Sequence, residues 1–269
     1  MSCDDPARCS FLAYGVPLSI EVEATDLVEP VWQHLPPSAE LHQGESPGRT
    51  YAFRPHRGDP GDGPRYTVFV DGKPLICGVG AAAALRAFEA DAQIHVAEMS
   101  PNFVFVHAGV VGWQGQAILL PGRSFCGKTT LVAALVQSGA EYYSDEYAVL
   151  DASGRVHPYT RRLSIRQDGG KSALRYSAGE LGGSEAHTPL PVGLVVMSHY
   201  NSQGHWQPRD LSPGRAALVL LENTVPARRR PEAVIATLRH VVSSARLFVS
   251  ERGEAAGVAP QIVELAMRQ

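Results

Sequence analysis

The stretch "LLPGRSFCGKTTLVAAL", residues 119–135, decides the fold class of this chain. Residues 122–129 within it match the phosphate-loop pattern G-x-x-x-x-G-K-[ST]. The apolar run at residues 116–120 predicts a buried strand, and Lys128–Gln137 predicts a helix. Strand, glycine loop and helix in this order form the setting in which the pattern binds phosphate. The stretch therefore predicts an α/β protein with a phosphate site at this turn.

The residue types in the loop explain why it suits a nucleotide. Gly122 and Gly127 allow a tight turn whose backbone N–H groups face an anion, and the helix N-terminus adds a partial positive charge. Lys128 is expected to reach the β- and γ-phosphates of ATP, and Thr129 to bind Mg²⁺. The predicted nucleotide contacts are Gly122, Arg123, Ser124, Phe125, Cys126, Gly127, Lys128, Thr129 and Thr130.

Two adjacent acids follow the predicted helix and a short apolar segment. Asp145 and Glu146 are expected at the end of a neighbouring strand, beside the loop, where their side chains point in different directions. One would meet Mg²⁺ while the other faces the incoming hydroxyl group. The alternative interpretation is a solvated turn without chemistry.

Three further residues are candidates from their positions alone. His107 stands in the apolar run "FVFVHAGVV", so it is either a satisfied core residue or a group beside the loop. Arg162 and Arg166 share one face if their segment is a strand, and either could hold phosphate or substrate oxygens. A plain surface role is the alternative for both arginines.

The rest of the chain predicts two regions, residues 1–98 as an α+β accessory region and residues 99–269 as an ATP-binding catalytic domain. Asp71-Gly72 between two apolar runs predicts a hairpin over residues 65–77. Strands and helices alternate after the loop, which indicates an α/β class with a mixed sheet. The other expected elements are strands at Val16–Val22, Arg49–Arg54 and Val192–Met197, and helices at Ala81–Met99, Pro213–Glu222, Pro231–Ser244 and Ala259–Met267.

Composition excludes several classes of function. The formal net charge of −3 does not indicate a nucleic-acid partner, and no apolar run approaches the length of a membrane span. The N-terminus lacks a basic segment followed by an apolar one, so we expect no signal peptide and a cytoplasmic location. A homo-oligomer stays open. Lysine occurs only at Lys73, Lys128 and Lys171, which makes a lysine inside the loop pattern less probable by chance.

The segment His107–Asp151, "HAGVVGWQGQAILLPGRSFCGKTTLVAALVQSGAEYYSDEYAVLD", resembles the catalytic core of the HPr serine kinase/phosphorylase family. That family is related in fold to phosphoenolpyruvate carboxykinase, which "GKTTL" also echoes. The resemblance implies ATP and Mg²⁺ as cofactors and transfer of the γ-phosphate to a serine hydroxyl. It implies that Asp145 is the general base, that Glu146 lies near the metal, and that His107 supports the first acid and the transferred phosphate, so the catalytic set is Asp145, His107 and Lys128.

The chain departs from the family in the loop and beyond it. Arg123 replaces an acid, Phe125 replaces a glycine, and Glu146 stands where the family has aspartate. The E-x-R-G-x-G signature of the phosphorolytic reaction is absent, so the resemblance favours kinase activity. Divergent stand-alone relatives are similar to kinases that tailor ribosomal peptides such as lasso peptides, which makes a peptide or small hydroxyl acceptor the expected partner.

Two rival functions follow from the same residues. Arg123 and Phe125 motivate a nucleotide-binding regulator without transfer activity. A carboxykinase-like lyase is the other rival, and it would need Lys73 and Lys171 to supply a second metal-binding set.

Overall fold

The structure is a computed structural model that describes residues 8–43, 48–57, 63–122, 127–167 and 172–268. The chain divides into two compact units, Met1–Asn102 and Phe103–Gln269. Each unit has its own sheet and its own buried residues. Together the described residues form an α/β protein with mixed sheets. None of the described helices has the length and apolar character needed to cross a membrane.

The N-terminal unit is a sheet covered by one long helix, α2 (Ala81–Met99). Phe88 of α2 packs edge-on against Tyr51 and Phe53, with ring centroids 4.9 and 5.3 Å apart. Such tilted aromatic contacts anchor the helix to the sheet. The other elements are β1 (Arg8–Ala13), β2 (Val16–Val22), a 3₁₀ turn (Thr25–Leu27), α1 (Val28–Gln33), β3 (Glu40–Leu41), β4 (Arg49–Pro55), β5 (Tyr66–Val70) and β6 (Lys73–Val79). The strand order in the sheet is β3-β1-β2-β4-β5-β6.

Several sequence predictions for this unit are confirmed. The strand predicted at residues 16–22 and the helix predicted at residues 81–99 have the predicted bounds. The predicted hairpin is β5 and β6, and its turn residues Asp71 and Gly72 both have positive φ, 49° and 77°. A tight turn between right-twisted strands requires that conformation.

The second unit has a mixed sheet whose central strands are parallel. Strand β8 (Gln116–Pro121) pairs in parallel with β14 (Leu190–Tyr200), and β14 pairs in parallel with β16 (Arg246–Arg252). The carboxyl ends of these three strands therefore meet at one edge of the sheet. The remaining strands of the unit are β7 (Val104–Trp113), β9 (Glu141–Ser144), β10 (Tyr147–Leu150), β11 (Arg155–His157), β15 (Arg209–Asp210) and the separate pair β12 (Leu163–Gln167) and β13 (Ser172–Tyr176).

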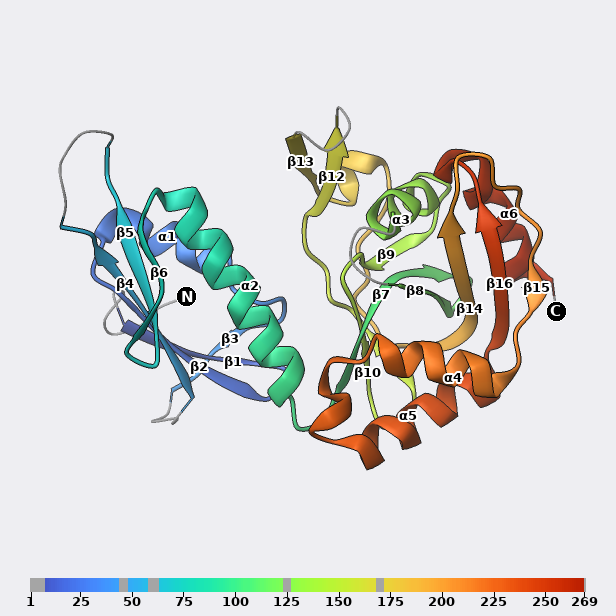
Figure 1. Ribbon diagram of the computed structural model, residues 1–269, viewed down its shortest axis with the longest axis horizontal. Helices are drawn as coiled ribbons and strands as arrows, with labels where there is room; N and C mark the ends of the chain where they lie inside the picture. Colours follow the sequence, from blue (N-terminus) through green and yellow to red (C-terminus); the bar gives the residue numbers. More distant parts are fainter. Residues whose placement is uncertain (1–7, 44–47, 58–62, 123–126, 168–171, 269) are drawn as a thin grey trace. The chain divides into compact units, whose positions relative to one another are not determined.

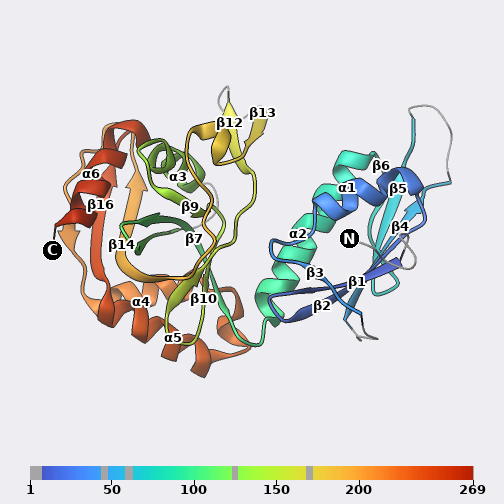
Figure 2. The same cartoon turned by 180° about the vertical axis from the view of Figure 1, so that it is seen from behind.

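Helices cover both faces of this sheet, as Figures 1 and 2 show from opposite sides. Helices α3 (Lys128–Gln137) and α6 (Ala255–Met267) share one apolar core with the sheet, and α4 (Pro213–Glu222) and α5 (Pro231–Ser244) share the other. The predictions for α3, α4 and α5 are confirmed to the residue. Helix α6 begins at Ala255 rather than at the predicted Ala259 and contains Pro260.

Helix α3 lies so close to β7 that Gly109 has no room for a side chain. A Cβ atom at Gly109 would come within 2.5 Å of Cγ2 of Val132, a buried and branched side chain of α3. Gly109 therefore sets how closely the helix behind the phosphate-loop sequence approaches the sheet.

We expect Gly109→Ala to lower the free energy of unfolding by about 1–3 kcal/mol, because a packed core must shift to admit the methyl group. Urea denaturation followed by circular dichroism measures the change. The matched control is Gly257→Ala in α6, where nothing lies within 4 Å of the added atom. A helical glycine replaced by alanine there should be neutral or stabilising by about 0.4–1 kcal/mol. Equal unfolding curves for Gly109→Ala and the unchanged protein would contradict the packing argument.

Candidate functional site

The loop sequence joins the end of β8 to the start of α3, at the edge where the parallel strands end (Figure 1). Its first residue is held by the neighbouring strand, since the N–H of Gly122 donates to the carbonyl oxygen of His107 at 3.3 Å. Its last glycine, Gly127, has φ of 82° and ψ of 21° and precedes the first turn of α3. Glycine suits this left-handed conformation. The predicted contacts Arg123, Ser124, Phe125 and Cys126 lie outside the described residues.

Lys128 connects the start of α3 to the first residue of the loop sequence. Its backbone begins α3, while its Nζ atom donates a hydrogen bond of 2.8 Å to the carbonyl oxygen of Gly122. The ammonium group thus lies beside the first residue of the loop sequence, where a bound phosphate group would need a cation. Thr129 follows, half-buried, and Thr130 is exposed.

The acid pair interrupts what would otherwise be one strand along β7. Strand β9 before the pair and β10 after it both pair antiparallel with β7. The buried Ser144 holds the interruption, because its Oγ accepts the N–H groups of Glu146 at 3.1 Å and Tyr147 at 2.9 Å. Asp145 and Glu146 form a bend at this interruption, and their side chains have different partners.

Asp145 connects the acid pair to the helix that follows the loop. Its carboxylate is 4% exposed and accepts two hydrogen bonds, from Oγ1 of Thr129 at 2.8 Å and from the hydroxyl of Tyr142 at 3.0 Å. Burial first, and then the Asp145 charge, raise the pKa of Tyr142 well above its ordinary value, so this hydroxyl stays a donor. Both oxygens of Asp145 therefore have fixed partners, and one of them is the predicted magnesium ligand Thr129.

Glu146 lies beside His107 instead. An Oε1 atom of Glu146 is 3.6 Å from Nδ1 of His107, and among the described residues this nitrogen has no hydrogen-bond partner. The His107 ring also lies against Tyr147, with ring centroids 4.6 Å apart. Burial lowers the pKa of His107 more than the Glu146 charge raises it, so the imidazole is neutral near pH 7. His107 is thus a half-buried group beside the second acid, whereas the resemblance implied support of the first.

Of the two predicted arginines, the structure describes the side-chain contacts of Arg162. Arg162 donates to Oε2 of Glu180 and to the carbonyl oxygen of Arg175, both at 2.9 Å, and its side chain is 54% exposed. This is the plain surface role that the sequence left open. Arg166 lies in β12 opposite Ala173, and its side chain lies outside the described residues. The neighbouring Arg161 is nearer the acids, since its charge and its backbone both act on the Tyr142 hydroxyl.

Sequence reasoning missed four residues that surround the predicted site. Tyr142 and Ser144 immediately precede the acids, but a buried tyrosine and a buried serine in a strand carry no pattern that distinguishes them from core residues. Arg161 directly precedes the predicted Arg162 in the segment before β12 and carries no pattern that distinguishes it. Arg252 comes 125 residues after Gly127 and contacts it. Only the sheet order brings it there, so no local signal could have found it.

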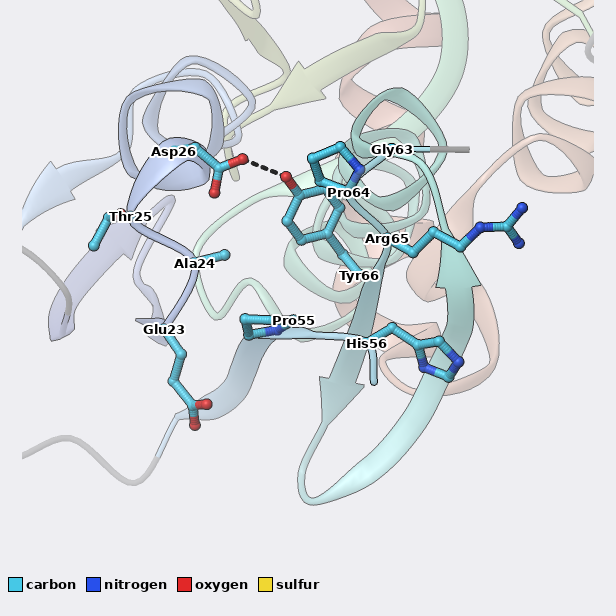
Figure 3. Close-up of a pocket in the computed structure, with 10 residues that line it drawn as sticks. All are labelled: Glu23, Ala24, Thr25, Asp26, Pro55, His56, Gly63, Pro64, Arg65 and Tyr66. Atoms are coloured by element: carbon cyan, nitrogen blue, oxygen red, sulfur yellow. Dashed lines mark hydrogen bonds between the residues drawn. The ribbon is translucent and has the colours of Figure 1, made fainter. Parts of the chain in front are cut away.

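A pocket of about 650 Å³ lies in the N-terminal unit (Figure 3). Its acidic groups already have partners. The hydroxyl of Tyr66 donates to Asp26, as the dashed line in Figure 3 marks, and Glu23 pairs with Arg54 at 2.8 Å. The predicted site residues do not line this pocket, so the candidate site remains the loop and acid pair of the second unit.

The described geometry joins a cation at the loop, a hydroxyl-bearing helix start, one buried carboxylate bonded to that hydroxyl, and a second carboxylate beside a neutral imidazole. Such a set can bind an anion with a metal ion and can accept a proton from a hydroxyl group. No protein-family model matches the chain, and no curated protein matches it. What the chain does is therefore inferred from the residues of the site.

Proposed function

We propose that this protein is an ATP- and Mg²⁺-dependent kinase that transfers the γ-phosphate to a hydroxyl group, a serine of a peptide or of a small acceptor. The observation that carries the proposal is the hydrogen bond of 2.8 Å between Thr129 and Asp145. It joins the threonine of the G-x-x-x-x-G-K-T sequence to an acid between β9 and β10. Phosphate-loop enzymes use that pair of groups on the metal side of the nucleotide.

The proposed fold assignment is the phosphate-loop core of the HPr kinase and phosphoenolpyruvate carboxykinase type. Its support is the order β8, loop sequence, α3, together with Gly127 in a left-handed conformation before the helix. The first helical N–H groups and Lys128 then face the place where phosphate would bind. In this proposal the residues from Gly122 to Thr130 cradle the nucleotide.

Magnesium fits the donor set better than a tightly held structural metal does. Among the described residues no three His, Cys, Asp or Glu side chains cluster as a metal site. Mg²⁺ is commonly bound by one or two carboxylates plus substrate phosphates and waters, which matches Thr129 and Asp145. When bound, the ion would neutralise charge on the transferred phosphate.

The contacts favour separate roles for the two acids. Asp145 is bonded to Thr129, so we assign it to the metal side. Glu146 is less buried and lies 3.6 Å from the neutral His107, so we assign it to accept the proton of the attacking hydroxyl. The resemblance implies the reverse assignment, with Asp145 as the base. The acceptor oxygen then bonds to the γ-phosphorus, the bond from phosphorus to the β–γ bridging oxygen breaks, and ADP leaves.

The test is intact-mass analysis of peptides encoded beside this gene after incubation with the protein, ATP and Mg²⁺. We expect a mass gain of one phosphate group on a serine-containing peptide, lost with Asp145→Asn and absent without Mg²⁺. Tight ATP binding with no transfer across a broad acceptor panel would overturn the kinase proposal in favour of the nucleotide-binding regulator. Oxaloacetate-dependent consumption of ATP would instead indicate a lyase. The lyase would need Lys73 and Lys171 for its second metal-binding set. Lys73 is an exposed residue of the N-terminal unit, and Lys171 lies outside the described residues.

A further inference from the structure

Arg252 ends the strand β16 at the edge of the sheet where the loop sequence begins. Strand β16 is parallel to β14, which is parallel to β8, and Arg252 is in register with Tyr200 of β14. Ligands of α/β sheets bind outside the carboxyl ends of the parallel strands. Arg252 therefore occupies the edge at which a ligand of the loop would lie.

The guanidinium group of Arg252 contacts the loop sequence directly. Its Nη2 atom donates to the carbonyl oxygen of Gly127 at 3.0 Å, and its Nη1 atom donates to that of Gly253 at 3.1 Å. The ring of Tyr200 lies beneath it, 5.3 Å from the guanidinium carbon, and the Tyr200 hydroxyl donates to Glu254 at 2.7 Å. Hydrogen bonds to carbonyls and an aromatic face are the contacts that suit the planar arginine head group.

Gly127 and Arg252 fit one another so closely that no side chain could stand between them. A Cβ atom at Gly127 would lie 2.6 Å from Nη2 of Arg252. The same Gly127 carbonyl also accepts the N–H of Leu131 at 3.1 Å in the first turn of α3. Arg252 thus fixes the peptide group at which the loop becomes the helix.

Arg252 brings a buried positive charge to the start of α3. Arg252 is 2% exposed, and a buried cation loses the solvation that water would give it. A cation fixed at the entrance of a helix N-terminus gains most when an anion binds there. Lys128 supplies one positive charge beside Gly122, and Arg252 supplies a second beside Gly127.

We infer that Arg252 is a positioning residue of the nucleotide site, holding Gly127 in place and lending fixed positive charge to the polyphosphate part of the ligand. Arg252 has this role only if the loop binds a nucleotide, so the inference rests on the proposed function. It further predicts that Arg252 acts on the phosphate groups and not on the nucleoside. The affinity for magnesium pyrophosphate should therefore depend on Arg252 as the affinity for MgATP does.

The experiment compares Arg252→Met with Arg246→Met by titration calorimetry against MgATP and against magnesium pyrophosphate. Arg246 is the matched control, because it begins the same strand and its Nη2 also donates to backbone carbonyls, those of Leu265 at 2.7 Å and Ala266 at 3.1 Å. We expect Arg252→Met to weaken both ligands about 10- to 100-fold and by similar factors, as the loss of a charged hydrogen-bonding group predicts. Arg246→Met should bind both ligands as the unchanged protein does.

Thermal melting of each unliganded variant separates a role in binding from a role in folding alone. A lower melting temperature of Arg252→Met with unchanged affinity would overturn the inference and leave the proposed function standing. If Arg252→Met does not fold, Arg252→Lys keeps the charge but cannot reach both carbonyls, and we expect an intermediate affinity. Arg252→Gln removes the charge and should weaken both ligands more than Arg252→Lys does, so affinity equal to the unchanged protein in Arg252→Gln would overturn the inference. No binding of MgATP by the unchanged protein would overturn the proposed function itself.

Discussion

Asp145→Asn should reduce phosphate transfer by about 10²- to 10⁴-fold, the range that loss of a positioned acid–base or metal-side carboxylate produces. Thr129 and Tyr142 both donate to the Asp145 carboxylate. An asparagine has only one acceptor oxygen, so its amide N–H₂ would face one of these two donors. We expect Thr129 to turn away, and the Mg²⁺-dependent part of ATP affinity to be lost along with turnover.

Glu146→Gln is the companion variant, and it should separate the two acids. Glutamine keeps the shape of Glu146 and its position beside His107, but it cannot accept a proton from the attacking hydroxyl. We expect turnover to fall by about 10²-fold or more while MgATP affinity stays within about threefold. Single-turnover quench measurements give the transfer rate, and calorimetry with and without Mg²⁺ gives the affinities.

The control for both variants is Asp151→Asn, which changes a carboxylate close by in sequence but bonded to His157 and Ser153 on the surface. It should transfer phosphate as the unchanged protein does. If Asp145→Asn keeps Mg²⁺-dependent binding while losing turnover, Asp145 is the base and the assignment implied by the resemblance holds. Normal turnover of Asp145→Asn would remove the acid pair from the mechanism.

The elements that the sequence predicted well are those that a pattern of neighbouring residues determines. Helix α3 has apolar residues throughout its buried length and a glycine on each side, and its bounds were confirmed. Helix α2 has Leu85, Phe88, Ala92 and Val96 at helical spacing, and its bounds were also confirmed. The predicted hairpin follows from Asp71 and Gly72, which adopt the positive φ angles of a tight turn.

Elements that depend on distant partners were not predictable in the same way. Strand β1 was missed, and its backbone pairs with both β2 and β3. Strand β11 has three residues and exists because β10 and β14 both pair with it. Helix α6 begins before Pro260, because Ala255, Val258 and Ala259 pack into the core that α3 shares. Tertiary packing there outweighs the tendency of proline to mark a helix start.

The residues of the candidate site also differ in whether the local sequence could predict them. The order of strand, loop sequence and helix placed Lys128 and Thr129, and the chain order placed the acids on a neighbouring strand. Which acid meets which partner depends on the bend between β9 and β10, where Ser144 accepts two backbone N–H groups, and no spacing rule encodes it. Arg252 reaches the site only because three strands that are far apart in the sequence pair in parallel.

Lys128→Met should abolish detectable ATP binding at concentrations that saturate the unchanged protein. The Lys128 ammonium lies 2.8 Å from the carbonyl oxygen of Gly122, the first residue of the loop sequence, and in the proposed function it pairs with the β- and γ-phosphates. Removing one partner of a desolvated ion pair costs about 3–5 kcal/mol, which corresponds to roughly 10²- to 10⁴-fold in affinity. Lys73→Met is the matched control, since Lys73 is an exposed lysine of β6 in the N-terminal unit.

The scarcity of lysine permits a direct chemical test of the same residue. In an acyl-phosphate derivative of ATP, a lysine amine near the terminal phosphate attacks the acyl carbonyl carbon, forms an amide and releases ATP. Only three lysines can react, so peptide mass analysis assigns the label without ambiguity. We expect labelling at Lys128 that excess MgATP prevents and that Arg252→Met weakens. Labelling at Lys73 or Lys171 instead, or labelling at Lys128 that ATP does not prevent, would contradict a nucleotide site at this loop.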